Sequence, residues 1–290
     1  MRKTIYLTTV LLAVGVCIFQ LCPADAAEPA ATQLTCILGA FDDELTLLYQ
    51  ALTDPKEEVL HGIHFASGKM KGRSVIVCRS GIGKVNAAMV TALVIEHYRP
   101  GEIIFSGIAG GINPDLRPGD IVMAAKTAQH DFGTLTIEGM RVDGTKSAVT
   151  WQRNPVFLEP DARLMALAEA SGKRIKLADI ETGKGKRHPK IIKGIVVTGD
   201  VFVASPAKAA ELRKTLGADA VEMEGAAVAQ VCRDLGVPWL VIRSISDGAD
   251  ANALQDIDSF TALAAKNSAE LVMDIVAHLA GQAARETIGK

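Results

Sequence analysis

The sequence predicts an α/β fold, a single domain in which helices flank a central twisted β-sheet. Short apolar segments that suit buried strands alternate with longer segments whose apolar residues recur at helical spacing. Glycine-rich turns, at 80–84 and 107–111, follow two of the strands. No internal repeat and no linker interrupts the pattern. Alternation of this kind predicts a mainly parallel sheet covered on both faces.

Residues 1–26 have the pattern of a secretory signal peptide. Arg2 and Lys3 precede a nearly uncharged apolar run at 4–22, and Ala24-Asp25-Ala26 forms a small-x-small cleavage site. We therefore expect a periplasmic or secreted protein whose mature chain begins at about Ala27.

Two other interpretations of this leader are weaker. An uncleaved membrane anchor is disfavoured because Gly15, Gln20 and two threonines dilute the apolar run. A lipoprotein is disfavoured because Cys17 and Cys22 lack the small residue before them that lipid attachment requires. We expect no stable membrane anchor.

The mature chain comprises a leader at 27–33 and one domain at 34–290. Hydrophobic residues make up 49% of the sequence and the net charge is −2, which fits a large core and argues against a nucleic-acid partner. The basic run at 184–190 is interpreted as solvated surface. Cys36, Cys78 and Cys232 lie in apolar segments and are predicted to be buried free thiols.

The first half of the domain begins with a buried strand, and the helix at 84–97 carries apolar residues at helical spacing. The predicted elements are strand 34–39, helix 42–52, strands 61–67 and 74–79, helix 84–97, and strands 103–106 and 121–127.

In the second half, residues 133–190 are rich in Gly, Lys and Asp and are expected to form loops around one helix. A proline in the first turn marks the helix that starts at Pro206. The predicted elements are helix 164–170, strand 191–197, helix 206–216, strand 218–223, helix 225–235, strand 239–245 and helix 259–280.

Two acids follow buried strands. Glu224 comes after strand 218–223 and Asp247 after strand 239–245. Ionised carboxylates are costly to bury without a partner or a task. Ligands of open α/β sheets bind at the carboxyl ends of the strands. The pair predicts a site that recognises hydroxyls and moves protons.

Asp42, Asp43 and Glu44 open the first helix. Acids in a first turn also stabilise the helix dipole without any chemistry. If one of them faces the edge that carries Glu224 and Asp247, the site contains three carboxylates. No metal-ligand spacing joins these acids.

The glycine-rich loops permit close approach of a ligand. Residues 80–84 suit a polar ligand or a plain tight turn equally. They form neither a Walker loop nor a dinucleotide fingerprint. The loop at 107–111, with Ile108, Ala109 and Gly110, lets a ligand approach the backbone. His61 and His64 are interpreted as surface or turn residues.

Five motifs occur in order along the chain: Gly39-Ala40-Phe41-x-x-Glu44, Ser80-Gly81-Ile82-Gly83-Lys84-Val85, Gly107-x-Ala109-Gly110-Gly111, Val221-Glu222-Met223-Glu224 and Ser244-x-Ser246-Asp247-x-Ala249-Asp250. This is the order seen in the 5′-methylthioadenosine/S-adenosylhomocysteine nucleosidases, which the chain resembles from residue 34 to 279. This family is a branch of the purine nucleoside phosphorylase superfamily.

The resemblance implies a central mixed β-sheet and hydrolysis of a purine N-ribosidic bond, with neither metal nor organic cofactor. It implies a small purine nucleoside as the ligand and a homodimer as the assembly. Asp247 would protonate N7 of the purine, Glu224 would bind the ribose hydroxyls, and Glu44 would deprotonate the attacking water.

Substrate-binding roles follow from the same resemblance. Phe202 would stack on the base and the Val203 backbone would read its edge. Met223 would pack beneath the ribose, while Arg243 and Ser246 would support the water and Asp247. Ile108 stands where the family commonly has a serine.

Two alternatives stay open. A phosphorylase on the same fold is disfavoured because Glu44 would repel phosphate, although Lys84 and Arg243 favour that alternative. A periplasmic nucleoside-binding protein without turnover is disfavoured because a binder needs no acid and base. The long segment 133–190 is expected to reshape the 5′ side of the pocket.

Overall fold

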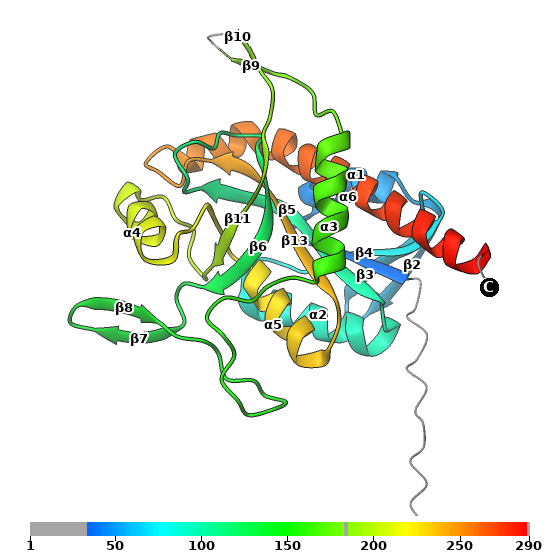
Figure 1. Ribbon diagram of the computed structural model, residues 1–290, viewed down its shortest axis with the longest axis horizontal. Helices are drawn as coiled ribbons and strands as arrows, with labels where there is room; N and C mark the ends of the chain where they lie inside the picture. The colour runs from blue at the N-terminus through cyan, green and yellow to red at the C-terminus, as the bar shows by residue number, and fades with distance from the viewer. Residues whose placement is uncertain (1–33, 183–184, 289–290) are drawn as a thin grey trace, which may run out of the picture. The chain divides into compact units, whose positions relative to one another are not determined.

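The computed structural model describes residues 34–182 and 185–288. The predicted signal peptide and the leader at 27–33 lie outside these residues. The described part contains a nine-stranded mixed sheet in the order β12-β11-β6-β13-β5-β1-β4-β3-β2 and two small hairpins, β7-β8 and β9-β10. Helices lie on both faces of the sheet (Figure 1). The predicted α/β class and the mixed sheet are confirmed.

The elements alternate along the chain. The strands of the main sheet are β1 (Leu34–Gly39), β2 (Thr53–Leu60), β3 (Ile63–Met70), β4 (Arg73–Arg79), β5 (Glu102–Gly111), β6 (Ile121–Gln129), β11 (Ile191–Thr198), β12 (Ala220–Glu222) and β13 (Trp239–Asp247). The hairpin strands are β7 (Gly133–Thr136), β8 (Gly139–Val142), β9 (Ile180–Thr182) and β10 (Gly185–Arg187). The helices are α1 (Asp42–Gln50), α2 (Lys84–Tyr98), α3 (Ala162–Arg174), α4 (Pro206–Leu216), α5 (Gly225–Leu235) and α6 (Ala253–Ile288).

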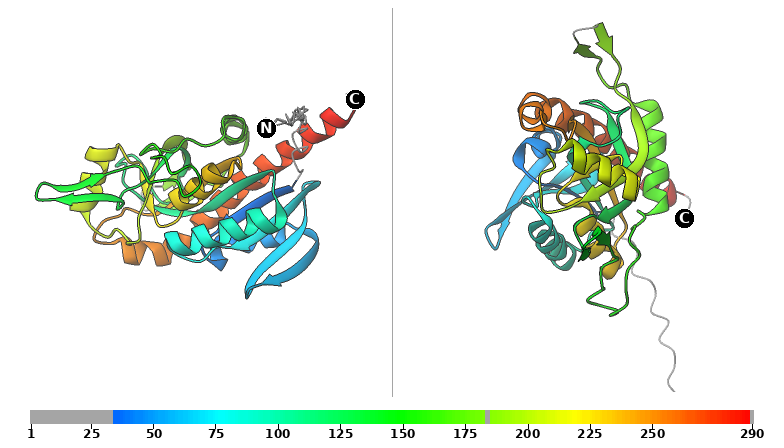
Figure 2. Two further views of the ribbon diagram at one scale, coloured as in Figure 1. Left: turned by 90° about the horizontal axis from the view of Figure 1, so that it is seen from below. Right: turned by 90° about the vertical axis from the view of Figure 1, so that its left-hand side faces the viewer.

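Two hydrophobic cores lie on opposite faces of the sheet. Helices α1, α3 and α6 bury their apolar residues against one face, and α2 and α5 cover the other. Figures 1 and 2 show the same two layers. The strands between them are apolar on both sides because both faces are covered, which explains why their sequences read as continuous apolar runs.

The pairing is less parallel than the alternation of elements suggests. Strands β1, β4, β5 and β13 run parallel. However, β2, β3 and β4 form an antiparallel meander, and β13 pairs antiparallel with β6. Parallel pairs therefore remain the majority in the described sheet, and these antiparallel pairs make it mixed.

Three elements differ from the prediction, and the differences in β2 and β5 have clear physical causes. Strand β2 was missed because nearly all of its side chains are exposed, so it lacks an apolar alternation. Strand β5 continues through the glycines to Gly111, since the carboxyl half pairs with β13 and β12. Helix α6 begins at Ala253, six residues before the predicted start at 259, and extends to Ile288.

The segment 133–190 is partly structured rather than all loop. It forms both hairpins, and α3 is longer than predicted. The carboxylate of Asp120, which is fully buried, accepts hydrogen bonds from the Arg187 guanidinium and from the Lys190 N–H. Lys186 and His188 pair with nearby acids. Opposing charges therefore neutralise part of the basic run.

The three cysteines of the described residues, Cys36, Cys78 and Cys232, are buried and free, as predicted. Within the same residues, none of the helices combines the length and apolar character that a bilayer crossing demands.

The fold gathers the predicted site at one edge of the sheet. Asp247 is the last residue of β13, Glu224 immediately precedes α5, and Glu44 lies in the first turn of α1. Each position lies at or just after the carboxyl end of a strand, where side chains from sequence-distant segments meet.

Candidate active site

Glu44 is held by backbone amides from two strand ends. Its side chain is buried, and its Oε2 atom accepts a hydrogen bond from Ala40 N at 2.5 Å. Its Oε1 atom accepts one from Ile108 N at 2.8 Å. Burial raises the pKa of Glu44, while Arg243 and these amides oppose the rise. A carboxylate in this setting is oriented and basic enough to take a proton.

Asp247 lines the same pocket as Glu44 and is also buried. Ser246 Oγ donates to its Oδ2 at 2.8 Å, and Ala249 N donates to its Oδ1 at 2.8 Å. Burial raises the pKa of Asp247 despite these hydrogen bonds, and the charges of Asp256 and Asp250 raise it further. A raised pKa keeps a proton available for transfer nearer to neutral pH.

Glu224 is bound by the loop that precedes α2. Gly83 N donates to its Oε1 at 2.8 Å, and the Arg243 guanidinium lies 3.7 Å from its Oε2. Burial, followed by the charge of Glu222, raises the pKa of Glu224 to about 8. Among the described residues no backbone N–H donates to its Oε2 atom, which is therefore the more available for a ligand hydroxyl.

Glu222 is the structural acid of the group. Arg243 Nη2 donates to its Oε2 at 2.6 Å, and Gly225 N donates to the same atom at 2.7 Å. Its Oε1 accepts from Thr198 Oγ1. Arg243 itself is fully buried and stacks on the Phe105 ring with its guanidinium carbon 4.1 Å from the ring centroid. Arg243 therefore compensates the acids from below the pocket.

Two glycines of β5 leave room for the carboxylates. A Cβ atom at Gly107 would collide with the Glu44 carboxylate, and one at Gly110 would lie 2.9 Å from Asp247 Oδ1. Gly107 and Gly110 are three residues apart on β5, or roughly 10 Å at about 3.3 Å per residue. The spacing suits a substrate and a water molecule between the two carboxyl groups.

The pocket between these acids is mostly apolar. Ile108, Ala109 and Gly110 form one wall, with Met223 and Phe202 among the other lining residues. Phe202 is 41% exposed, so part of its ring is free to contact a flat base. Val203 is buried in a separate core cluster and does not line the cavity with its side chain.

The apolar lining residues that sequence reasoning missed include Phe41, Ile82 and Ile257. Phe41 and Ile82 belong to motifs that had been identified, so their positions were the available signal. Ile257 lies in the first turns of α6, which had been predicted to start after it.

An ionic cluster at 2.6–2.8 Å ties three loops together beside the pocket. Lys84 N donates to Asp200 Oδ1 at 2.7 Å, which supplies the cap that the α2 N-terminus otherwise lacks. Asp131 accepts from Lys84 Nζ at 2.6 Å and from Asp200 N at 2.8 Å. The cluster links Gly83, which holds Glu224, to the loop that carries Phe202.

Known proteins resemble the chain over most of its length. Residues 35–277 match the model of the phosphorylase superfamily. A 5′-methylthioadenosine/S-adenosylhomocysteine nucleosidase of Shewanella halifaxensis is 36% identical over 244 residues, covering 84% of this chain and 98% of the relative.

Solved structures of similar sequence share the fold of this chain. The nucleosidase of the same name from Colwellia psychrerythraea, in complex with adenine, has a TM-score of 0.74 at 32% identity and covers 85% of this chain and 95% of its own. The futalosine hydrolase of Helicobacter pylori has a TM-score of 0.73 at 33% identity, with 84% and 97% covered.

Proposed function

Because the chain belongs to the phosphorylase superfamily and, within it, to the 5′-methylthioadenosine/S-adenosylhomocysteine nucleosidases, we propose that it hydrolyses the N-ribosidic bond of a 5′-substituted adenine nucleoside. The products are adenine and the free 5′-substituted ribose. The observation that carries this proposal is the placement of Glu44, Glu224 and Asp247 around one apolar pocket.

Bond cleavage leaves positive charge on the sugar and negative charge on the departing base. Asp247, whose pKa is raised by burial, donates its proton to N7 of the purine and neutralises that base. Ser246 Oγ orients the carboxyl group through its contact with Oδ2. Without this proton the base would leave as an anion, which is a much poorer leaving group.

Water attacks the anomeric carbon from the side of Glu44. The Ala40 and Ile108 amides fix this carboxylate, and its negative charge also stabilises the cationic sugar. Glu44 takes a proton from the water as the new C–O bond forms. Glu224 holds the ribose by accepting hydrogen bonds from its hydroxyls, so that the ribose ring lies between the general base Glu44 and the general acid Asp247.

Hydrolysis is favoured over phosphorolysis by the same geometry. A phosphate dianion at the position of the water would lie against the Glu44 carboxylate and the apolar Ile108 side chain. The buried Arg243 is already bound to Glu222 and lies below the pocket. It is therefore not free to receive phosphate.

The proposal is tested by incubating the mature protein with methylthioadenosine, S-adenosylhomocysteine, adenosine and inosine, with and without phosphate, and measuring free base. We expect phosphate-independent release of adenine from the 5′-thio nucleosides. Absence of base under every condition would rule out an enzyme, and a requirement for phosphate would indicate a phosphorylase.

Two substitutions test the assigned chemistry. We expect Asp247→Asn and Glu44→Gln each to lower kcat by at least about a hundredfold, the scale of a lost acid or base. Circular dichroism and thermal unfolding should show an intact fold. Near-normal turnover in either variant would remove that residue from the mechanism.

We also propose that the enzyme is exported. The support is the sequence of residues 1–26, a basic start followed by an apolar run and Ala24-Asp25-Ala26. Expression of the full chain in a Gram-negative host, followed by mass spectrometry of the periplasmic fraction, should give an N-terminus at about Ala27. Recovery of the intact leader in the cytoplasmic fraction would contradict export.

A further inference from the structure

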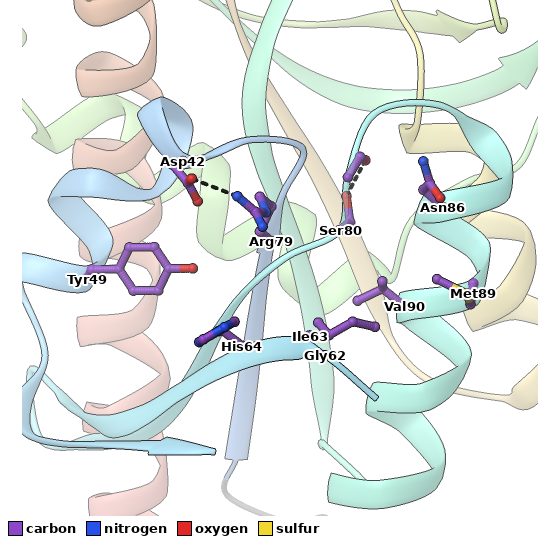
Figure 3. A pocket seen from close by; sticks show the side chains of 11 residues that line it. Asp42, Tyr49, Gly62, Ile63, His64, Arg79, Ser80, Asn86, Met89 and Val90 are labelled. Atoms are coloured by element: carbon purple, nitrogen blue, oxygen red, sulfur yellow. Dashed lines mark hydrogen bonds and ion pairs between the residues drawn. The ribbon is translucent and has the colours of Figure 1, made fainter. Parts of the chain in front are cut away.

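A second cavity, of about 480 Å³, adjoins the candidate active site. It lies between α1 and α2, at the ends of β3 and β4 (Figure 3). Its polar lining comes from Asp42, Tyr49, His64, Arg79 and Asn86. None of these side chains has a role in the proposed hydrolysis.

Two short chain segments separate this cavity from the active site. Phe41 lines the active site and its neighbour Asp42 lines the second cavity. In the same way, Ile82 lines the active site, whereas Ser80 and Gly81 line the second cavity. The two cavities are therefore neighbours across Phe41 and Ile82.

The strand order shows which end of a bound nucleoside would face the second cavity. Asp247 is on β13, and the sheet continues through β5 and β1 to β4 and β3. A nucleoside with its base at Asp247 and its hydroxyls at Glu224 extends its 5′ carbon away from β13, toward Phe41 and Ile82. Three strand spacings of about 4.8 Å, roughly 14 Å, separate β13 from β4, which carries Arg79.

In this orientation a methylthio group would end at Phe41 and Ile82, which line the active site, whereas a longer 5′ substituent would continue past them. The groups that such a substituent would meet are charged. Arg79 Nη1 lies 2.7 Å from Asp42 Oδ2, with side chains that are 53% and 67% exposed. An exposed ion pair contributes little to stability, so it opens at little cost to receive a ligand that bears both charges.

We propose that Arg79 and Asp42 form a subsite for a zwitterionic amino-acid group at the 5′ end of the substrate. Arg79 binds the α-carboxylate and Asp42 binds the α-ammonium group, each by charge-assisted hydrogen bonds. The substrate class is an adenine nucleoside with an amino-acid tail on its 5′ sulfur, as in S-adenosylhomocysteine. This inference rests on the proposed hydrolysis and specifies which 5′ substituent that site accepts.

The rest of the cavity suits such a tail. Figure 3 shows Tyr49 directing its hydroxyl from α1 toward the cavity, with Asn86 placed on α2 on the opposite side. Met89 and Val90 supply apolar surface for the methylene groups of the tail. The cavity thus offers polar partners for the charged end and apolar contact for the chain that leads to it.

The test compares substrates that differ only at the 5′ end. We expect Arg79→Ala to lower kcat/KM for S-adenosylhomocysteine by about tenfold, the loss of one charge-assisted contact, and to leave methylthioadenosine within about twofold. Asp42→Asn should have the same selective effect. Lys69→Ala, which removes an exposed cation from the far end of β3, is the control and should change neither substrate.

A third substrate separates the two contacts. The decarboxylated analogue of S-adenosylhomocysteine keeps the ammonium group, so Asp42→Asn should weaken it and Arg79→Ala should not. Equal losses on all substrates, or no loss on S-adenosylhomocysteine, would overturn the subsite. A wild-type protein that hydrolyses neither thio nucleoside would instead overturn the proposed function.

Discussion

At the residue scale, the buried carboxyl groups of the site differ in their surroundings, as Glu222 and Glu224 show. Glu222 is fully engaged by Arg243, Thr198 and two backbone amides. Glu224, by contrast, has one strong backbone partner, and burial raises its pKa to about 8. A charge that lacks full compensation costs stability, and Glu224 is the clearest example.

Stability should consequently depend on pH through Glu224. Its folded pKa of about 8 exceeds its ordinary value of 4.5, so its stabilising contribution is present below 4.5 and is lost as pH rises through about 8. We expect Tm of the wild type to fall between about pH 5 and pH 9 by at least about 2 °C more than that of Glu224→Gln. Differential scanning calorimetry of both proteins measures this, and parallel curves would contradict it.

The sequence reveals site residues that act through their side chains, but not those that act through their backbone amides. The positions of Glu44, Glu224 and Asp247 could be predicted because each follows an apolar strand and belongs to a motif. The backbone amides of Gly83 and Ile108 that hold Glu224 and Glu44 carry no side-chain signal. Gly83 lies in the loop before α2 and Ile108 lies in strand β5, both far from the acids in sequence, so only the folded chain shows these contacts.

At the element scale, predictability follows burial. Helices α4 and α5 have the predicted bounds because proline and glycine mark their ends and each has an apolar face. Strand β2 escaped detection because it pairs with β3 through its backbone while its side chains remain in solvent. The strands of hairpins β7-β8 and β9-β10 were not predicted for the same reason.

The ionic cluster beside the pocket makes a prediction for the loop between β11 and α4. Asp200→Ala removes the cap of α2 and the link between Gly83 and Phe202, so we expect a loss of about 1 kcal/mol in the free energy of unfolding. KM for methylthioadenosine should rise several-fold, since Glu224 and Phe202 lose their common support. Urea unfolding and steady-state kinetics measure both.

Asp200→Asn is the matched variant, because an amide oxygen still accepts from Lys84 N. It should keep most of the stability and most of the affinity. If Asp200→Ala matched the wild type in KM, the cluster would have no part in positioning the pocket.

At the scale of the whole molecule, apolar side chains are exposed beside the pocket. Ile82, Val85 and Met89 are 55%, 78% and 50% exposed, and the last two lie one helical turn apart on α2. Exposed apolar groups that cluster in this way mark interaction sites. We propose that this face of α2 contributes to a homodimer.

The dimer proposal is tested by light scattering after size exclusion. We expect the wild type to have twice the mass of the mature chain, and Val85→Glu, which leaves the lining of both cavities unchanged, to shift it toward the monomer. Activity should fall with dissociation, because Ile82 lines the active site and lies beside the same face. A monomeric wild type at micromolar concentration would refute the dimer.

The buried cysteines bear on how an exported chain of this kind would fold. Burial raises the pKa of the Cys36 and Cys232 thiols, and raises that of Cys78 to about 12. Since only the thiolate attacks a disulfide, the folded protein is protected from oxidation. The thiols are open to oxidation only during folding, before the sheet closes around them. Speed of folding, rather than any disulfide, would then determine whether the enzyme survives an oxidising compartment.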